Sequence, residues 1–455
     1  MNNNIYRVGT ANMYENTLRN LGTRQTNLSN LQENLTSGKR VVRASDDPVS
    51  AAQAERALNR LARIQTEQRA LETQRNAIAQ AESSLGDAVG LVQEARQLLV
   101  SAGNAALSSS ERATISNQLQ SLRDQLTAVA NRTDTNGLPL LGALGSAQSP
   151  FLGPLGSTPD YLFAGQPGQA ASNGVAIPNT LDGDAAFMFD ATRDGSFHAA
   201  ITQGTGTVIA PGATTASVPA GAQPNRALTT SPITVTPGFV FNEDPATGQA
   251  YSYSVSFSNV TLNPATNTLS ATYNITSTDP AFVPPAAQTL TPIKIGEKNE
   301  FSINGVPGMA FKITATPTKA VDGTITLSPA DGDTIGIAPN ASLFSVIDKA
   351  VNELRAAPNS SLASQAAGQA LANVDKGLER MGNIRSFAGE LLNRADRITG
   401  DQSKRSIQLE ADRSRAEDLD MIKGISDFQN QQVGYEAALK SYSMVQKLSL
   451  FNFIG

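Results

Sequence analysis

The sequence predicts a multidomain α + β protein, in which long helical arms from both ends of the chain carry an inserted all-β outer domain. Three observations support this fold class. Apolar residues repeat every seven positions over long stretches near both ends of the 455-residue chain. No aromatic residue lies between Tyr14 and Phe151, whereas 16 of the 24 aromatic residues lie in 151–344. The middle of the chain is rich in Gly, Pro, Thr and Ser and contains short alternating apolar runs.

The first arm is predicted to be helical over most of residues 10–132. One heptad position holds Tyr14, Leu21, Leu28 and Leu35, and the other holds Leu18, Gln25 and Gln32. Gly38 is expected to end this first helix. The sequence Ser45-Asp46-Asp47-Pro48 is typical of a new helix start, with Ser or Asp as the cap and Pro in the first turn.

Two further helices complete this arm. The heptad residues Ile64, Leu71, Ile78, Leu85, Val92 and Leu99 predict a helix over about 48–102, roughly 80 Å long at about 1.5 Å per residue. Gly103 is expected to stop it. The pair Ser108 and Glu111 has the spacing of a capping box, so a return helix is expected to follow.

Residues 138–338 predict one or two small all-β domains. Apolar residues alternate with polar ones in 251–257 and 268–275, as they do in half-buried strands. The only charged residues in 199–290 are Arg226, Glu243, Asp244 and Asp279. The regular placement of aromatic residues favours a folded domain despite this low charge.

The second arm begins near residue 341. Apolar residues spaced three and four apart from Ala370 to Ile398 predict a long helix, which Gly400 is expected to interrupt. The last helix places Met421, Phe428, Tyr435 and Tyr442 at one heptad position. Ile425, Gln432, Leu439 and Gln446 occupy the other position, and an apolar tail follows at 448–454.

These patterns predict three domains, each of the first two built from both ends of the chain. Residues 1–44 and 414–455 are expected to form a terminal coiled-coil assembly domain. Residues 45–150 and 339–413 are expected to form a helical bundle, and 151–338 the inserted β-rich outer domain.

The composition argues against an enzyme and against bound cofactors or metals. The chain has no Cys and a single His, His198, so cysteine nucleophiles, cysteine-ligated metals and multi-histidine sites are excluded. We expect His198 to be a turn or surface residue. The Asp-Gly-Asp sequences at 182–184 and 331–333 do not continue into a calcium-binding loop and are expected to form turns.

Nucleic-acid binding and membrane insertion are not expected either. The formal net charge is -5, and no apolar run approaches the roughly 18–20 residues of a membrane-spanning helix. The N-terminus lacks the apolar core of a cleaved signal peptide. The basic cluster Lys39, Arg40 and Arg43 allows two interpretations, a contact with a partner or a solvated loop.

Four stretches, in order along the chain, resemble motifs of the flagellin superfamily, and in particular of the subunits at the junction between flagellar hook and filament. They are Leu35–Pro48 (LTSGKRVVRASDDP), Tyr161–Gly165 (YLFAG), Asp331–Ile337 (DGDTIGI) and Gln446–Ile454 (QKLSLFNFI). The resemblance covers about 1–165 and 330–455, and it implies a flagellin-like fold and a structural, self-assembling, non-enzymatic subunit.

The resemblance also implies a location, an export route and partners. The subunit would be extracellular, in the bacterial flagellum, and secreted without a cleaved signal peptide through the flagellar type III export apparatus. Its partners would be the first hook-associated junction protein, flagellin, further copies of itself, and a cytoplasmic export chaperone at the C-terminal helix. Filament flagellin or another axial protein is the alternative. A β-domain adhesin on a helical stalk or a hydrolase is a third interpretation, against which the motifs and the scarcity of His and Cys speak.

Assembly through the terminal helices implies a set of contact residues. They are Tyr14, Leu18, Leu21, Leu28, Leu35, Met421, Ile425, Phe428, Tyr435, Leu439, Tyr442, Leu448, Leu450, Phe451, Phe453 and Ile454, with Ser45, Asp46, Asp47 and Pro48 as the junction motif. Because Gln occupies many seam positions, these helices are expected to be mobile in the monomer and to fold on assembly. The apolar tail is expected to be buried in the polymer or captured by the chaperone.

Overall fold

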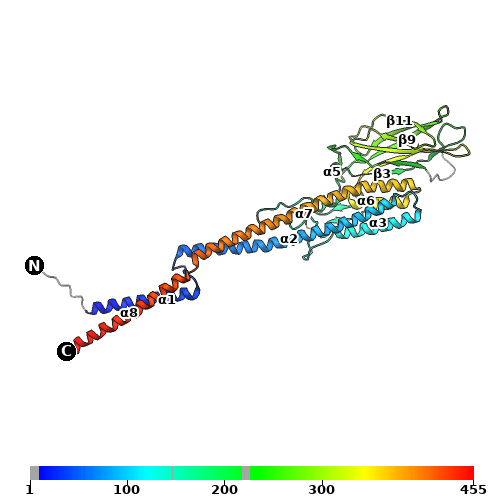
Figure 1. Ribbon diagram of the computed structural model, residues 1–455. Coiled ribbons are helices and arrows are strands. Elements are labelled where there is room, and N and C mark those ends of the chain that lie inside the picture. The colour runs from blue at the N-terminus through cyan, green and yellow to red at the C-terminus, as the bar shows by residue number, and fades with distance from the viewer. Residues whose placement is uncertain (1–9, 146, 218–225, 455) are drawn as a thin grey trace. The chain divides into compact units, whose positions relative to one another are not determined.

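The computed structural model describes residues 10–145, 147–217 and 226–454, without the side chains of residues 10, 11, 13, 14 and 445–454. The chain divides into two compact units (Figure 1). The first comprises the chain up to Ala70 and from Asp396 onward, and the second comprises Leu71–Ala395.

The three helices predicted for the first arm are present. They are α1 (Thr10–Ser37), α2 (Pro48–Ala102) and α3 (Ser109–Ala130). Gly38 follows α1 with φ +70°, a left-handed conformation that glycine adopts readily at a helix end. Ser108 and Glu111 form the predicted capping box at the start of α3.

The second arm comprises α6 (Leu343–Ala356), α7 (Ser360–Glu417) and α8 (Met421–Ile454). The prediction that Gly400 interrupts a helix is wrong, because α7 runs through it to Glu417. A glycine inside a helix costs only about 1 kcal/mol relative to alanine, which packing along a long helix can offset. The break instead precedes α7 at Pro358, where a proline cannot supply the N–H that a continuing helix needs.

Heptad residues form the buried helical core of the second unit. On α2 the residues Ile78, Leu85, Val92 and Leu99 are fully buried, as their seven-residue spacing predicted. On α7, Val374, Met381, Ala388 and Ala395 are likewise fully buried. These residues, together with α3 packed along α6, make a helical bundle.

Residues 138–196 contain few strands, so the predicted β character is right only from Phe197 onward. This segment holds β1 (Phe151–Leu152), β2 (Leu162–Phe163), α4 (Gly183–Phe187) and α5 (Ala191–Asp194) between loops. Its aromatic residues do not alternate along strands but pack against α6, where Phe344 stacks with Tyr161 and Phe187.

The strands of the β domain pair antiparallel. They are β3 (Phe197–Thr202), β4 (Gly206–Ile209), β5 (Ala227–Thr230), β6 (Thr234–Val235), β7 (Glu243–Asp244), β8 (Gln249–Ala250), β9 (Tyr253–Asn263), β10 (Thr268–Ser277), β11 (Gln288–Lys294), β12 (Asn299–Ile303), β13 (Met309–Thr316), β14 (Thr318–Lys319), β15 (Ile325–Asp331) and β16 (Thr334–Pro339). The larger sheets have the orders β11-β10-β9-β16-β3, β12-β13-β5 with β6 on β13, and β14-β15-β4, and β7 pairs with β8.

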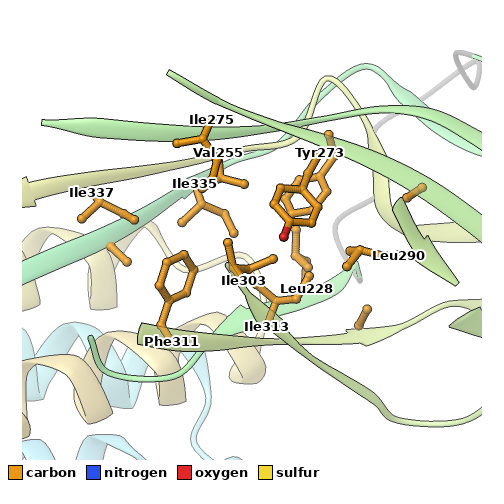
Figure 2. Packing of buried hydrophobic residues seen from close by; sticks show 14 of the residues in the cluster. Leu228, Val255, Tyr273, Ile275, Leu290, Ile303, Phe311, Ile313, Ile335 and Ile337 are labelled. Carbon is orange, nitrogen blue, oxygen red and sulfur yellow. The ribbon is translucent and has the colours of Figure 1, made fainter. Parts of the chain in front are cut away.

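The core of the β domain lies between strands of the two largest sheets. Figure 2 shows Val255, Tyr273 and Ile335 on one side, facing Ile303 and Ile313 on the other. The alternation read in 251–257 is confirmed, because Tyr253, Val255 and Phe257 are buried in β9.

Polar side chains of α7 dock the β domain onto the helices. The backbone N–H of Ala199, on the edge strand β3, donates to Oε1 of Gln369 (2.8 Å), and Nε2 of Gln369 donates back to the carbonyl of Ala199 (3.1 Å). Nδ2 of Asn373 donates to the carbonyl of Phe197 (3.0 Å). These amides satisfy the backbone groups that an edge strand would otherwise leave unpaired.

His198 is not the turn or surface residue that we expected. It lies on β3, largely buried, and its Nε2 is 2.5 Å from Oε1 of Glu353 on α6. The sequence alone does not indicate that His198 is buried, because its ionic partner Glu353 lies 155 positions away along the chain.

The sequence Asp331-Gly332-Asp333 forms the predicted turn, and it also anchors a buried ion pair. Gly332 has φ +81°, which favours glycine. Asp333 is paired with Arg226, and both side chains are buried. Asp333 also accepts hydrogen bonds from the backbone N–H groups of Ala330 (2.8 Å) and Gly204 (2.7 Å). In the other Asp-Gly-Asp sequence, Asp182 caps α4 by accepting from the N–H of Ala185.

Tyr161, the first residue of the second motif, belongs to a polar network inside the helical bundle. Its hydroxyl donates to Oδ2 of Asp348 (2.7 Å) and accepts from Nη1 of Arg123 (2.7 Å). Burial, and then the hydrogen bond with Asp348, raise the pKa of Tyr161, so its hydroxyl stays protonated.

Across the described ranges, no helix combines the length and apolar character that crossing a membrane requires.

Candidate assembly interface

The terminal helices α1 and α8 lie side by side in the first unit (Figure 1). The loop after α1 and the loop before α8 meet at an antiparallel bridge between Lys39 and Asp418, and the N–H of Leu419 donates to the carbonyl of Gly38 (2.9 Å). Because α1 runs into this junction and α8 runs out of it, the two helices are antiparallel.

The predicted contact residues of α1 differ in burial. Leu21 is buried, Leu28 and Leu35 are half-buried, and Leu18 is 44% exposed. The backbone of Tyr14 is helical, but its side chain lies outside the described residues. Packing within this chain therefore buries the α1 stripe only in part.

The face of α8 that packs in the pair follows a clear heptad. Phe428, Tyr435 and Tyr442 are half-buried, and they alternate with Gly424, Gln431 and Ala438. A Cβ on Gly424 would lie 3.2 Å from Cδ2 of Leu35, so glycine allows α1 and α8 to approach closely there. Ile425, Gln432 and Leu439, the second heptad position of the sequence prediction, lie one residue beyond this seam and are exposed.

The rest of α8 presents a broad exposed apolar surface, which we call the outer face. It comprises Met421, Ile422, Ile425, Val433, Leu439 and Met444. Ile422 and Val433 are 85% and 66% exposed. The sequence analysis missed Ile422, Val433 and Met444, whose eleven-residue spacing places them on one line of the helix at about three turns apart.

The apolar tail continues α8. The backbone is helical to Ile454, whereas the side chains of Leu448, Leu450, Phe451, Phe453 and Ile454 lie outside the described residues. Their contacts thus stay a prediction.

Asp47 is the cap of α2 within the junction motif. Its Oδ1 accepts the N–H of Ser50 (3.1 Å) and its Oδ2 accepts the hydroxyl of Ser50 (2.6 Å), while Pro48 is the first helical residue. Hydrogen bonds from Ser50, reinforced by Arg40, lower the pKa of Asp47 to about 2. The carboxylate is therefore ionised at neutral pH, as capping by an anion requires.

The neighbouring residues shape the loop before the cap. Oδ2 of Asp46 accepts the N–H groups of Val42 (3.2 Å) and Arg43 (2.8 Å), and Ser45 lies exposed between them and the helix. Asp46 thus fixes the turn, while Asp47 starts the helix.

The basic cluster is engaged inside the chain. Lys39 pairs with Glu417, Arg43 pairs with Glu33 (2.8 Å), and Arg40 binds Asp47 and the carbonyl of Ala416 (2.9 Å). Arg40 therefore ties the start of α2 to the end of α7. The three side chains nevertheless remain 48%, 47% and 66% exposed, so a further contact with a partner stays a prediction.

The described side chains do not provide a metal centre: in 10–145, 147–217 and 226–454, no group of three or more His, Asp or Glu side chains is placed to hold an ion. The site is a packing surface, whose chemistry consists of apolar side chains, caps and ion pairs.

Comparisons with known proteins agree with this arrangement. Residues 8–144 match the family model described as the bacterial flagellin N-terminal helical region. A crystal structure of flagellar hook-associated protein 3 from Legionella pneumophila is 22% identical, with a TM-score of 0.55, over 78% of this chain and 97% of that one. A crystal structure of a flagellar junction protein from the same organism is 22% identical, with a TM-score of 0.52, over 80% of this chain and all of that one.

No curated protein sequence matches the chain. At 22% identity the two crystal structures establish the fold, and they confirm the predicted class of helical arms with an inserted β domain. The predicted resemblance is confirmed as well: residues 8–144 match the bacterial flagellin N-terminal helical region, and the fold over most of the chain is similar to that of the two crystal structures.

Proposed function

We propose that this protein is a structural subunit of the bacterial flagellum that joins the hook, through the first junction protein, to the flagellin filament. The observation that carries the proposal is the outer face of α8, whose six large apolar side chains are exposed in this chain and would be covered on assembly. The names of the two similar structures, a hook-associated protein and a junction protein, supply the place in the flagellum.

Assembly is proposed to couple to folding of the terminal helices. Among the described contact residues proposed for α1 and α8, only the side chain of Leu21 is buried in this chain. Ordering a helix costs about 1–2 kcal/mol per residue in backbone entropy, which so little burial offsets poorly. Neighbouring subunits would supply the missing apolar surface.

The proposed partners are the first hook-associated junction protein, flagellin, further copies of this chain, and an export chaperone that holds the C-terminal helix in the cytoplasm. Export through the flagellar type III apparatus is part of the proposal. The domain limits predicted from the sequence remain part of the proposal: 1–44 with 414–455 for assembly, 45–150 with 339–413 for the bundle, and 151–338 for the outer domain.

Electron cryo-microscopy of native flagella tests the proposal. We expect this chain in a ring at the boundary between hook and filament, and a strain that lacks it should secrete flagellin without assembling it on the hook. Density for this chain along the whole filament would instead identify a filament flagellin, and its absence from flagella would refute a flagellar role.

A truncated variant tests the role of the tail. Deleting residues 448–455 should abolish incorporation or chaperone binding, because the apolar side chains of the tail would be lost. A truncated chain that still binds the chaperone and assembles normally would contradict the proposed role.

A further inference from the structure

A hollow between α2 and α7 in the first unit carries two arginines that have no partner among the described residues. It has a volume of about 400 Å³ and a floor of Ala57, Leu409 and Ala416. Arg56 and Arg60 lie at its rim, one helical turn apart, and neither makes a hydrogen bond or ion pair with any residue that the structure describes. Arg415, also at the rim, is already paired with Asp412 (2.6 Å).

Two guanidinium groups without a partner among the described residues, beside an apolar floor, fit a carboxylate that is flanked by apolar side chains. Guanidinium groups bind carboxylates in a bidentate manner, and the alanines leave space for an aliphatic group below them. The ligand need not come from a different protein, because α8 of this chain has a carboxylate flanked by apolar side chains.

Glu436 is the carboxylate at the middle of the outer face of α8. Val433 and Leu439, three residues before and after it, are 66% and 42% exposed. Among the described residues, the hydrogen bond to the Glu436 carboxylate is a long one from Nε2 of Gln432 (3.4 Å). Glu436 therefore presents its carboxylate between two exposed apolar side chains, and no ion pair with a described residue engages it.

We propose that the hollow receives the outer face of α8 from a second copy of this chain. Arg56 and Arg60 bind Glu436 of that copy, and Val433 or Leu439 sits on the alanine floor. The inference rests on the proposed function and names the surfaces through which copies meet. Because the hollow and α8 are different surfaces, the contact is head-to-tail, and such contacts propagate into closed rings or helical assemblies.

Cross-linking in flagella tests this contact, and the chain suits it because it contains no native cysteine. Arg60→Cys and Glu436→Cys variants would be co-expressed in the source bacterium in place of the native copy. Isolated flagella would be treated with a short bismaleimide, and linked peptides identified by mass spectrometry. Since each chain carries one cysteine, every 60–436 link joins two copies.

Asp427→Cys is the matched control, because Asp427 is an exposed carboxylate on the opposite side of α8. We expect 60–436 links to be several-fold more abundant than 60–427 links. Equal yields in flagella that contain the chain would overturn the contact and leave the proposed function standing. Absence of the chain from flagella would overturn both.

Charge reversal gives an independent readout. Glu436→Arg should lower incorporation into flagella about tenfold, because like charges would then oppose each other at the hollow. The double variant Arg60→Glu with Glu436→Arg should recover most of that loss. Asp427→Arg should incorporate normally; failure of the double variant to recover would argue against the pairing.

Discussion

At the scale of single residues, the structure assigns different tasks to side chains that are adjacent in the sequence. Asp46 holds a loop through the N–H groups of Val42 and Arg43, while Asp47 caps α2 through Ser50. The sequence predicted a cap within Ser45–Pro48 but left its identity open between Ser and Asp. Only the geometry of the turn decides which carboxylate faces the free N–H of the helix.

Removing the cap should weaken the start of α2 in a pH-dependent way. The pKa of Asp47 in the folded chain is about 2, below the ordinary value of about 4. Its stabilisation is therefore fully present above pH ~4 and is lost as the pH falls through about 2. In Asp47→Ala, hydrogen exchange of residues 48–58 should be faster than in the parent chain at pH 7, and the difference should shrink towards pH 2. Asp427→Ala controls for the loss of an exposed charge. A difference that persists at pH 2 would contradict this assignment.

The buried pair of Arg226 and Asp333 should be costly to break. Arg226→Met leaves the carboxylate of Asp333 buried without its counter-ion, which costs about 3–5 kcal/mol in comparable cases. Urea unfolding followed by hydrogen exchange of the β9 and β10 amides, which report on the β domain, measures the loss. Lys298→Met, which removes an exposed ion pair with Glu300, should cost about 1 kcal/mol or less. Equal costs in the two variants would show that the buried pair contributes little.

At the scale of elements, sequence patterns predict the structural features that depend on residues within the same helix or strand. Seven-residue spacing identified the buried residues of α2, and alternation identified β9, because burial of one face imposes those periods. The continuation of α7 through Gly400 and the loops of 138–196 escaped prediction, because packing between distant segments decides both. Half of the outer face of α8, namely Ile422, Val433 and Met444, was missed because these residues fall outside the heptad positions that were read.

The amides of α7 show the same limit. A polar residue at a helical position reads as exposed, yet Gln369 and Asn373 are buried against the edge strand β3. No local sequence pattern distinguishes a glutamine that faces water from one whose side chain hydrogen-bonds to the backbone of an edge strand, as a neighbouring strand would.

Gln369→Leu should loosen the docking of the β domain. The change leaves the backbone N–H of Ala199 without its acceptor, at about 1–3 kcal/mol for a buried unsatisfied group, whereas the carbonyl of Ala199 keeps a hydrogen bond from Nε2 of Gln365 (3.3 Å). The amide of Ala199 should exchange faster, while amides in the centre of β9 keep their protection. Gln408→Leu, at an exposed position of the same helix, is the control. Unchanged exchange at Ala199 would mean that β3 is held by other contacts.

At the scale of the whole molecule, stability should be unevenly distributed. The β domain and the bundle contain fully buried heptad and strand residues, whereas α1 and α8 share one narrow seam. In the isolated chain, hydrogen exchange should therefore be rapid in α1 and α8, slow in α2 beyond residue 77, and slowest in β9 and β10. Full protection of α1 and α8 in the monomer would refute folding on assembly. Protection that appears only in flagella would support it.

The chain enters and leaves its β domain at one point. The N–H of Asn340 donates to the carbonyl of Ser196 (3.0 Å), and Nδ2 of Asn340 donates to Oγ of Ser196 (3.0 Å). Segments whose ends lie this close can be exchanged without moving the scaffold that carries them. We therefore expect other outer domains to be exchangeable between Ser196 and Asn340, provided that the replacement also pairs with the α7 amides Gln369 and Asn373.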